Sequence, residues 1–264
     1  MTQQQLNEIT NAVIDLSRTI GTWMKSQKTS ELTAEIKTEN NLVTYVDKES
    51  EHRFVEGLKQ IVPEAGFVAE EGTGERKMDG LNWVIDPLDG TTNFVHGVPV
   101  WCTSIALADK NKAIVGVIYD PHREEMFHAS LGNGAYLNGD KIQVSNIDKL
   151  GASLLATGFP YDDFGREEQY LRLFQELMHS TRGMRRLGSA ALDMAWTACG
   201  RFEGFYEYGL NPWDVAAGAI IVEEAGGRVT EFNDGDNPIF GEDVNCTNGH
   251  IHQDLKAIIT KYFI

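Results

Sequence analysis

Apolar side chains recur at steps of three and four residues along the start of the chain, which is the spacing of one face of an α-helix. This face consists of Leu6, Ile9, Val13, Leu16, Ile20 and Trp23. It predicts an amphipathic helix over about residues 3–25. The same spacing predicts a second helix over 47–60, which buries Phe54, Leu58 and Ile61.

The middle of the chain has the short apolar runs and turn residues of an antiparallel sheet. The predicted strands cover residues 102–109, 113–119 and 125–130. Asn133-Gly134 and Asn138-Gly139 are hairpin signals on either side of a further short strand. Later in the chain, strands and helices alternate. The predicted strands there are 153–158 and 202–208, and the predicted helices are 166–179, 189–199 and 212–226.

These elements predict an α+β arrangement for about residues 1–149 and an α/β arrangement for 150–264. We interpret the two as parts of a single domain, 1–264, because no long polar linker, internal repeat or low-complexity tract separates them. Hydrophobic residues make up 42% of the 264 positions, which is enough for a large core.

Composition narrows the class of protein. No apolar stretch approaches the roughly 18 residues that suggest a membrane span, and residues 1–5 lack the pattern of a signal peptide. We therefore expect a soluble, cytoplasmic protein without a membrane partner. Cys102, Cys199 and Cys246 are scattered without the spacing of a zinc site, which predicts buried free thiols.

The formal net charge of −16 argues against a nucleic-acid partner, because nucleic acid is bound through a basic surface. Most of the excess acids are expected on the solvated surface. An anionic substrate would nevertheless be repelled unless a local positive charge reverses the field. Bound divalent cations often supply the largest charge in such a site.

The most informative segment is 83–94, Trp-Val-Ile-Asp-Pro-Leu-Asp-Gly-Thr-Thr-Asn-Phe. An apolar strand leads into a stiff turn with two carboxylates three residues apart, Asp86 and Asp89. Pro87 restricts the backbone between them, and Gly90 tolerates a ligand close to the main chain. Carboxylates suit Mg²⁺, and the N–H groups that open the next element suit a phosphate. The segment therefore indicates metal-assisted phosphoryl transfer.

A single Asp-Gly pair is more often a β-turn than a site. The whole segment, however, closely resembles the metal-binding motif of the inositol monophosphatase family, an apolar strand followed by Asp-Pro-(Ile/Leu)-Asp-Gly-Thr. Glu70-Glu71 stands where that family has paired glutamates, and 213–218, Trp-Asp-Val-Ala-Ala-Gly, matches its second motif. The resemblance runs over essentially the whole chain. It implies a layered αβαβα sandwich of the sugar-phosphatase type.

The resemblance implies a site for two or three Mg²⁺ ions. Glu70, Asp86 and the backbone carbonyl of Leu88 would hold the first ion, and Asp86, Asp89 and Asp214 would hold the second. A pair of ions can clamp the attacking and leaving oxygens of an in-line displacement. Taken alone, Glu70 reads more often as a surface acid, and Asp214 as an acid that opens a helix.

The nucleophile implied by the resemblance is water, because Mg²⁺ keeps several waters. Thr91 and Glu70 are the candidates that orient and deprotonate it. Asp47, at the end of the matching segment 43–47, would orient Thr91, although an acid in the first turn of a helix is an equally good interpretation. The N–H groups of Gly90 and Thr91 are expected to bind phosphate oxygens.

Residues outside the metal cluster must select the substrate. The residues implied to contact it are Gly90, Thr91, Gly188, Ser189, Ala190, Glu207 and Asp214. Glu207 stands where the family has a glutamate that bonds an inositol hydroxyl, but it could also face solvent on a strand. Ser189 could serve only as a helix N-cap. Lys37 lies near the family's loop lysine, but Asn41 stands where an aspartate is common, so the role of Lys37 stays open. The role of Glu71 also stays open between a direct metal ligand and a residue that acts through water.

Other classes fit less well. Aspartyl-phosphate phosphatases carry Asp-x-Asp-x-Thr after a strand, whereas Asp86 and Asp89 are three residues apart and Asp214 has no counterpart there. The Gly and the twelfth-position Glu of an EF-hand-like calcium loop are absent. A metal-dependent sensor or scaffold without turnover is a further alternative, but no candidate ligand is missing. Arg185-Arg186 is expected to be a solvated basic pair rather than a contact for a second phosphate.

The resemblance implies a Mg²⁺-dependent phosphomonoesterase for a small sugar or polyol phosphate, with inositol monophosphate as the favoured substrate. Fructose 1,6-bisphosphate, the 2′-phosphate of NADP and 3′-phosphoadenylates are substrates of related members and stay open as alternatives. The resemblance further implies inhibition by Li⁺ and a homodimer. The partner that each subunit binds is expected to be a small phosphorylated metabolite.

Overall fold

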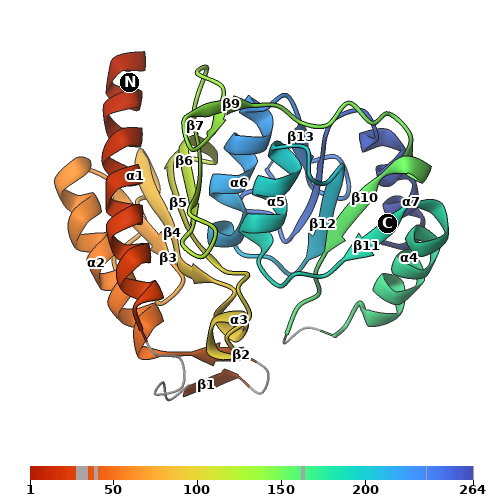
Figure 1. Ribbon diagram of the computed structural model, residues 1–264, viewed down its shortest axis with the longest axis horizontal. Coiled ribbons are helices and arrows are strands. Elements are labelled where there is room, and N and C mark those ends of the chain that lie inside the picture. Colours follow the sequence, from red (N-terminus) through yellow and green to blue (C-terminus); the bar gives the residue numbers. More distant parts are fainter. Residues whose placement is uncertain (28–34, 39–40, 162–163, 236, 264) are drawn as a thin grey trace.

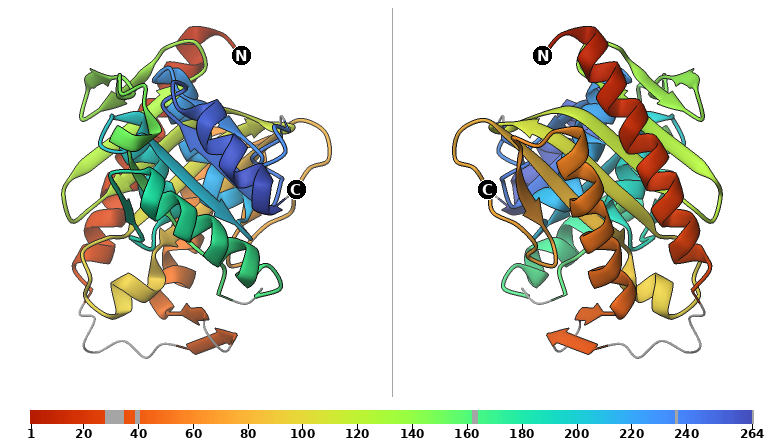
Figure 2. Two further views of the ribbon diagram at one scale, coloured as in Figure 1. Left: turned by 90° about the vertical axis from the view of Figure 1, so that its right-hand side faces the viewer. Right: turned by 90° about the vertical axis from the view of Figure 1, so that its left-hand side faces the viewer.

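Helices and sheets alternate in five layers, αβαβα, in the computed structural model of the chain (Figure 1). The structure describes residues 1–27, 35–38, 41–161, 164–235 and 237–263. The layers of helices are an outer pair, α1 (Gln3–Lys25) and α2 (Tyr45–Ile61), a central pair, α5 (Ala190–Ala198) and α6 (Pro212–Glu224), and a second outer pair, α4 (Glu167–Ser180) and α7 (His252–Phe263). Each outer pair packs side by side across one sheet (Figure 2).

The larger sheet has seven strands in the order β3-β4-β5-β6-β7-β8-β9. Their bounds are β3 (Gly66–Ala69), β4 (Leu81–Asp89), β5 (Cys102–Asp109), β6 (Lys112–Asp120), β7 (Glu125–Ser130), β8 (Ala135–Leu137) and β9 (Asp140–Ile142). Neighbours are antiparallel, except that β3 and β4 are parallel. The antiparallel sheet predicted for the middle of the chain is therefore present.

The smaller sheet has five strands in the order β11-β10-β12-β14-β13. Their bounds are β10 (Leu154–Thr157), β11 (Gly183–Arg185), β12 (Gly204–Tyr208), β13 (Arg228–Thr230) and β14 (Asp243–Thr247). β10 is parallel to β11 and β12, whereas β14 is antiparallel to both of its neighbours. The sheet predicted as α/β is thus mixed. The sequence pattern did not predict β13, β14 or α7.

Four small elements complete the described chain. Strands β1 (Glu35–Thr38) and β2 (Asn41–Val43) form an antiparallel pair, α3 (Thr91–Val95) follows β4, and a 3₁₀ turn (Leu150–Ala152) precedes β10. None of the described helices has the length and apolar character needed to cross a membrane. The three cysteines are free, as predicted, with Cys102 and Cys246 buried and Cys199 partly buried.

Helix α6 lies directly on the larger sheet. A Cβ atom added to Gly116 on β6 would lie 2.6 Å from Cγ2 of Ile220 and 2.7 Å from the carbonyl oxygen of Ala217. The helix is buried throughout from Val215 to Val222, because one sheet covers each side of it. A helix covered on two sides needs no polar face, which explains why α6 is apolar all round while α1 is amphipathic.

Candidate functional site

One pocket of about 250 Å³ lies where both sheets and the central helices meet. Its lining includes these residues predicted from the sequence: Glu70, Asp86, Leu88, Asp89, Gly90, Thr91, Gly188, Ser189, Ala190, Glu207 and Asp214. They come from β3, β4, α3, α5, β12 and α6 or the loops beside them. The fold thus brings the three sequence motifs together in one cavity.

The end of β4 positions two of the acids through a β-bulge. Asp86 pairs with Ser104 and Asp89 pairs with Cys102, so three steps along β4 oppose two along β5. The Leu88 N–H donates to Oδ1 of Asp86 at 2.9 Å. The prediction of a turn directly after Asp86 is therefore wrong in detail, because strand pairing continues to Asp89. Both acids still face the pocket.

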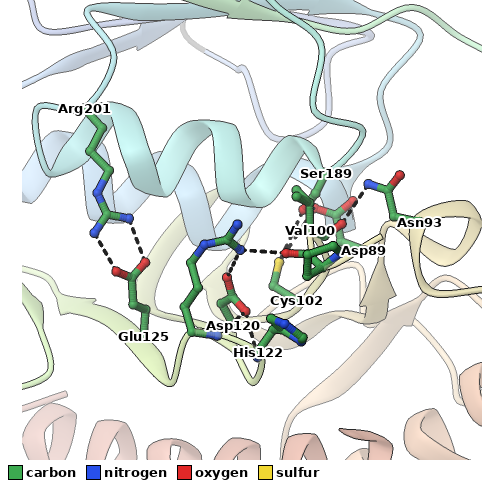
Figure 3. Close-up of polar contacts among 11 residues, drawn as sticks. Asp89, Asn93, Val100, Cys102, Asp120, His122, Glu125, Ser189 and Arg201 are labelled. Carbon is green, nitrogen blue, oxygen red and sulfur yellow. Dashed lines mark hydrogen bonds and ion pairs between the residues drawn. The ribbon is translucent and has the colours of Figure 1, made fainter. Parts of the chain in front are cut away.

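Asp89 is fixed by groups from α5 and β5. Its Oδ2 accepts a hydrogen bond from Oγ of Ser189 (2.7 Å), and the Cys102 thiol lies 3.8 Å away (Figure 3). Oδ2 also accepts a hydrogen bond from the N–H of Ala191 (2.8 Å). Burial raises the pKa of Asp89 to about 6, although these hydrogen bonds act to lower it. Ser189 occupies the N-cap position of α5 without capping the helix through its side chain, so the N-cap role considered for its hydroxyl is wrong.

Gly90 turns the chain from β4 into α3 with a φ of 98°. A Cβ atom there would lie 3.0 Å from the carbonyl oxygen of Val100 and 3.2 Å from that of Gly188, so glycine is required. On α3, Nδ2 of Asn93 donates to the carbonyl oxygen of Val100 at 2.7 Å (Figure 3). It also donates to the carbonyl oxygen of Leu187 at 2.8 Å. Asn93 therefore links the two halves of the chain beside the pocket.

Thr91 is hydrogen-bonded to a buried acid of the outer helix layer. Its hydroxyl lies 2.8 Å from Oδ1 of Asp47 and 3.1 Å from the carbonyl oxygen of Leu88. Oδ2 of Asp47 accepts hydrogen bonds from the N–H (2.8 Å) and the hydroxyl (2.6 Å) of Thr44. Asp47 therefore closes a capping box at the start of α2 and also accepts a hydrogen bond from Thr91.

Glu51 on α2 is a site-forming residue that the sequence analysis missed. It is fully buried, and its two carboxylate oxygens accept hydrogen bonds from the N–H groups of Glu71 (2.7 Å) and Thr73 (2.9 Å). Glu51 thus anchors the loop that carries Glu70. An acid one helical turn after Asp47, on the face that buries Phe54, was the available signal.

Asp214 lies in the first turn of α6, where its Oδ2 accepts the N–H of Asn211 at 2.7 Å. Burial raises the pKa of Asp86 and Asp214 well above the ordinary range, and repulsion from Glu70 and Asp89 raises both further. Within the described ranges, no three His, Cys, Asp or Glu side chains already surround one point as metal ligands would.

Glu207 lies on β12 and faces the pocket, which is inconsistent with a solvent-facing strand residue. A Cβ atom at Gly158 would collide with its carboxylate, so the glycine makes room for the acid. Burial raises the pKa of Glu207 to about 8, and the guanidinium of Arg186 acts in the opposite direction.

Arg186 is exposed, as expected of a solvated residue, but it also lines the pocket. Its guanidinium carbon lies 4.5 Å from the ring centre of Phe159 and 5.4 Å from that of Tyr161, and Nη2 donates to the Tyr161 hydroxyl at 3.1 Å. Lys37 and Asn41 lie on β1 and β2, but their side chains are outside the part of the chain that the structure describes.

Comparison with known proteins places these features in a family. Residues 5–263 match the profile described as the inositol monophosphatase family, so the chain belongs to that family. It is 44% identical to the inositol-1-monophosphatase of Synechocystis sp. over 220 residues, and this aligned region covers 83% of this chain and 77% of the relative. It is 40% identical over 224 residues to the Nus factor SuhB of Escherichia coli strain K12, which covers 84% and 83% respectively.

Solved structures confirm the fold class. The extragenic suppressor protein suhB of Bartonella henselae superposes with a TM-score of 0.90 at 34% identity, over 96% of this chain and 99% of that chain. An IMPase/NADP phosphatase complexed with NADP and Ca²⁺ superposes with a TM-score of 0.85 at 25% identity, over 96% and 95%. The layered sandwich implied by the sequence motifs is therefore shared with members of this family.

Proposed function

We propose that the chain is a Mg²⁺-dependent phosphomonoesterase that hydrolyses an inositol monophosphate, or a similar small sugar or polyol phosphate, through in-line attack by water. Family membership supports a phosphatase. The single observation that carries the proposal is the meeting of three acidic motifs in one pocket. Glu70, Asp86, Asp89 and Asp214 line that pocket together with the Gly90-Thr91 turn.

The donor groups fit Mg²⁺, because carboxylate and carbonyl oxygens are its preferred protein ligands. We assign Glu70, Asp86 and the Leu88 carbonyl to one ion. Asp86, Asp89 and Asp214 are assigned to a second ion, and we leave open whether a third ion binds in the same pocket. The mutual repulsion of these buried acids supports the assignment, since a cation would relieve it. Bound ions would attract the anionic phosphate and lower the pKa of the attacking water.

The chain's own residues would orient that water. Because the Thr91 hydroxyl donates its hydrogen to Oδ1 of Asp47, its lone pairs are available to accept a hydrogen bond from water. Thr44 fixes Asp47 for this role. Glu70 would serve as the second acceptor and take the proton. The N–H groups of Gly90 and Thr91 would hold phosphate oxygens at the start of α3.

The opposite wall of the pocket would hold the substrate's hydroxyl groups. Glu207 would accept a hydrogen bond from one of them, and Gly188, Ala190 and Asp214 lie along the same cavity. Ser189 would act through Asp89, since its hydroxyl already donates to that carboxylate. The positions of these residues support a polyol substrate over a simple aryl phosphate.

Phosphate release from inositol 1-phosphate, measured with Mg²⁺ and with excess chelator, tests the proposal. We expect turnover with Mg²⁺ and none with chelator. Binding of inositol 1-phosphate without release of phosphate would instead favour the alternative of a non-catalytic sensor or scaffold. Undiminished hydrolysis in chelator would contradict the metal mechanism.

Hydrolysis of the 2′-phosphate of NADP is a second candidate function. Arg186, stacked on Phe159 and beside Tyr161 at the pocket, offers a cation and planar rings to a nucleotide. The relative solved with NADP supports the same possibility. Turnover of NADP, fructose 1,6-bisphosphate and a 3′-phosphoadenylate, each compared with inositol 1-phosphate, would rank the candidates.

We also propose that the protein is a cytoplasmic homodimer inhibited by Li⁺, without a membrane or nucleic-acid partner. The net charge of −16 supports the last point, whereas the Nus factor name of the Escherichia coli relative makes it worth testing. Light scattering after size exclusion would give the oligomeric state. Gel shift with RNA at low and physiological salt would test nucleic-acid binding.

A further inference from the structure

One acid in the pocket has no role in the scheme above. Asp193 on α5 is 1% exposed and lines the cavity. Its Oδ1 is buried and has no hydrogen-bond partner among the residues that the structure describes. Burial, followed by repulsion from Glu207 and Asp89, raises the pKa of Asp193 well above its ordinary value. An unpartnered buried carboxyl oxygen costs folding free energy, so its presence calls for a ligand.

The neighbouring acids show what is unusual about Asp193. Asp89 accepts two strong hydrogen bonds, Asp47 accepts three, and Asp214 accepts one from the main chain. Within the described ranges, Asp193 is the only acid with a buried carboxylate oxygen left without a partner. Its main chain, by contrast, is satisfied, because its N–H donates to Ser189 at 3.1 Å and its carbonyl accepts from the Thr197 hydroxyl at 2.9 Å.

The location of Asp193 indicates which part of a substrate it would meet. It interacts electrostatically with Glu207, which lines the same pocket from β12. Two carboxylates repel a phosphate but accept hydrogen bonds from hydroxyl groups. A phosphorylated polyol would therefore lie with its phosphate near Gly90 and Thr91 and with its hydroxyls toward Asp193 and Glu207.

We propose that Asp193 is a specificity-determining residue, whose buried Oδ1 accepts a hydrogen bond from a substrate hydroxyl adjacent to the one bound by Glu207. The inference rests on the proposed function and names its substrate class more narrowly. Two acceptors from different elements match two neighbouring hydroxyls of a sugar or cyclitol ring. A substrate without such a pair leaves Asp193 unpartnered.

Two variants of Asp193 and one control test this. Asp193→Ala removes the acceptor, and Asp193→Asn keeps one amide oxygen in its place. Thr197→Val is the matched control, because this residue is also buried, lies one turn further along α5 and is not part of the pocket lining. The value of kcat/KM is measured for inositol 1-phosphate and for 4-nitrophenyl phosphate, which has no ring hydroxyls.

For inositol 1-phosphate, Asp193→Ala should lower kcat/KM by about 10- to 100-fold, with Asp193→Asn in between. For 4-nitrophenyl phosphate the change should stay within about threefold, because this substrate has no ring hydroxyl that Asp193 could bind. The ligand-free Tm of Asp193→Asn should equal or exceed that of the wild type, because the amide removes the repulsion from Glu207 and Asp89. Equal losses on both substrates, or a lowered Tm, would show a structural role and overturn the inference.

Binding separates this inference from the proposed function. Calorimetric titration with inositol 1-phosphate in Ca²⁺, where turnover is not expected, should give a weaker Kd for Asp193→Ala and an unchanged Kd for Thr197→Val. A wild-type protein that never hydrolyses in Mg²⁺ would contradict the phosphatase, and a weaker Kd for Asp193→Ala would still support this contact. Hydrolysis with identical Kd values for wild type and Asp193→Ala would contradict only the contact.

Discussion

At the scale of single residues, the acids of the site differ in how firmly the protein holds them. Asp89 is fixed by Ser189 and Ala191, and Asp47 is fixed by Thr44. Asp193 also lines the cavity, and one of its buried carboxylate oxygens has no hydrogen-bond partner among the described residues. A held carboxylate is positioned before ligands arrive, which suits metal coordination and water orientation. A carboxylate left without partners suits a hydroxyl that arrives with the substrate.

Replacing Asp89 with Asn should abolish turnover and preserve the fold. The amide keeps the shape of the side chain and can still accept from Ser189, but it lacks the charge that an ion requires. Phosphate release at saturating Mg²⁺ is the measurement, with Asp254→Asn on exposed α7 as the control. Activity above about a tenth of the wild-type value, a loss below roughly 1.4 kcal/mol in activation free energy, would contradict the ligand assignment.

The raised pKa of Glu207 predicts a pH dependence of stability in the metal-free protein. Between its ordinary pKa of 4.5 and its folded pKa of about 8, the folded state binds a proton that the unfolded state releases. The free energy of unfolding should therefore fall as pH rises through that window. Glu207→Gln lacks this proton, so its Tm should decline less between pH 5 and pH 8. Parallel Tm curves for variant and wild type would refute the shift.

Single residues also show how far the sequence could predict the site. The positions of Asp86, Asp89 and Asp214 in one pocket followed from ordered motifs that a family resemblance connects. No motif pointed to Glu51 or Asp193, because their importance depends on the hydrogen bond from Glu71 to Glu51 and on the repulsion between Asp193 and Glu207, which only the fold creates. A buried acid in a helix looks like any other acid until its neighbours are known.

At the scale of elements, the spacing of apolar residues predicted the elements that have one face on the core and one face in solvent. Helix α1 runs over Gln3–Lys25, as its apolar stripe predicted, because it faces solvent on one side and the sheet on the other. β13 (Arg228–Thr230), β14 (Asp243–Thr247) and α7 (His252–Phe263) were missed. The two strands are too short to establish a period. They are stabilised by long-range pairing with each other and with β12.

The contact between β6 and α6 gives a prediction at this scale. Gly116→Ala places a Cβ atom 2.6 Å from Ile220 and 2.7 Å from the carbonyl oxygen of Ala217, so the helix must move away from the sheet. Overpacking of this kind costs about 1–3 kcal/mol and should lower Tm by several degrees. Gly151→Ala is the control, since its Cβ atom would meet only one atom, at 3.8 Å. Equal Tm values for the two variants would contradict close packing of α6 on β6.

At the scale of the whole molecule, the site lies where the two sheets and the central helix layer meet. The larger sheet contributes Asp86 and Asp89, the central helix layer contributes Asp214, and the smaller sheet contributes Glu207. Asn93 bridges the halves through carbonyl groups of Val100 and Leu187. Residues distant in sequence therefore become one site only when the two sheets and the central helix layer assemble, which couples folding to the chemistry of the pocket.

Metal binding should consequently stabilise the whole fold and not only the pocket. Asp86 and Asp214 come from different layers and repel each other in the ligand-free protein, so an ion between them would replace repulsion with attraction. At ten times its Kd, bound Mg²⁺ would add about 1.4 kcal/mol to the free energy of unfolding, a rise in Tm of a few degrees. Thermal unfolding with 0 to 20 mM Mg²⁺, roughly the range that a millimolar Kd requires, measures this rise in Tm.

Asp214→Asn should reduce the rise in Tm, whereas Asp254→Asn, on the exposed surface of α7, should leave it unchanged. A wild-type Tm that does not respond to Mg²⁺ while Mg²⁺-dependent turnover is present would show that the ion is held by the substrate rather than by these carboxylates.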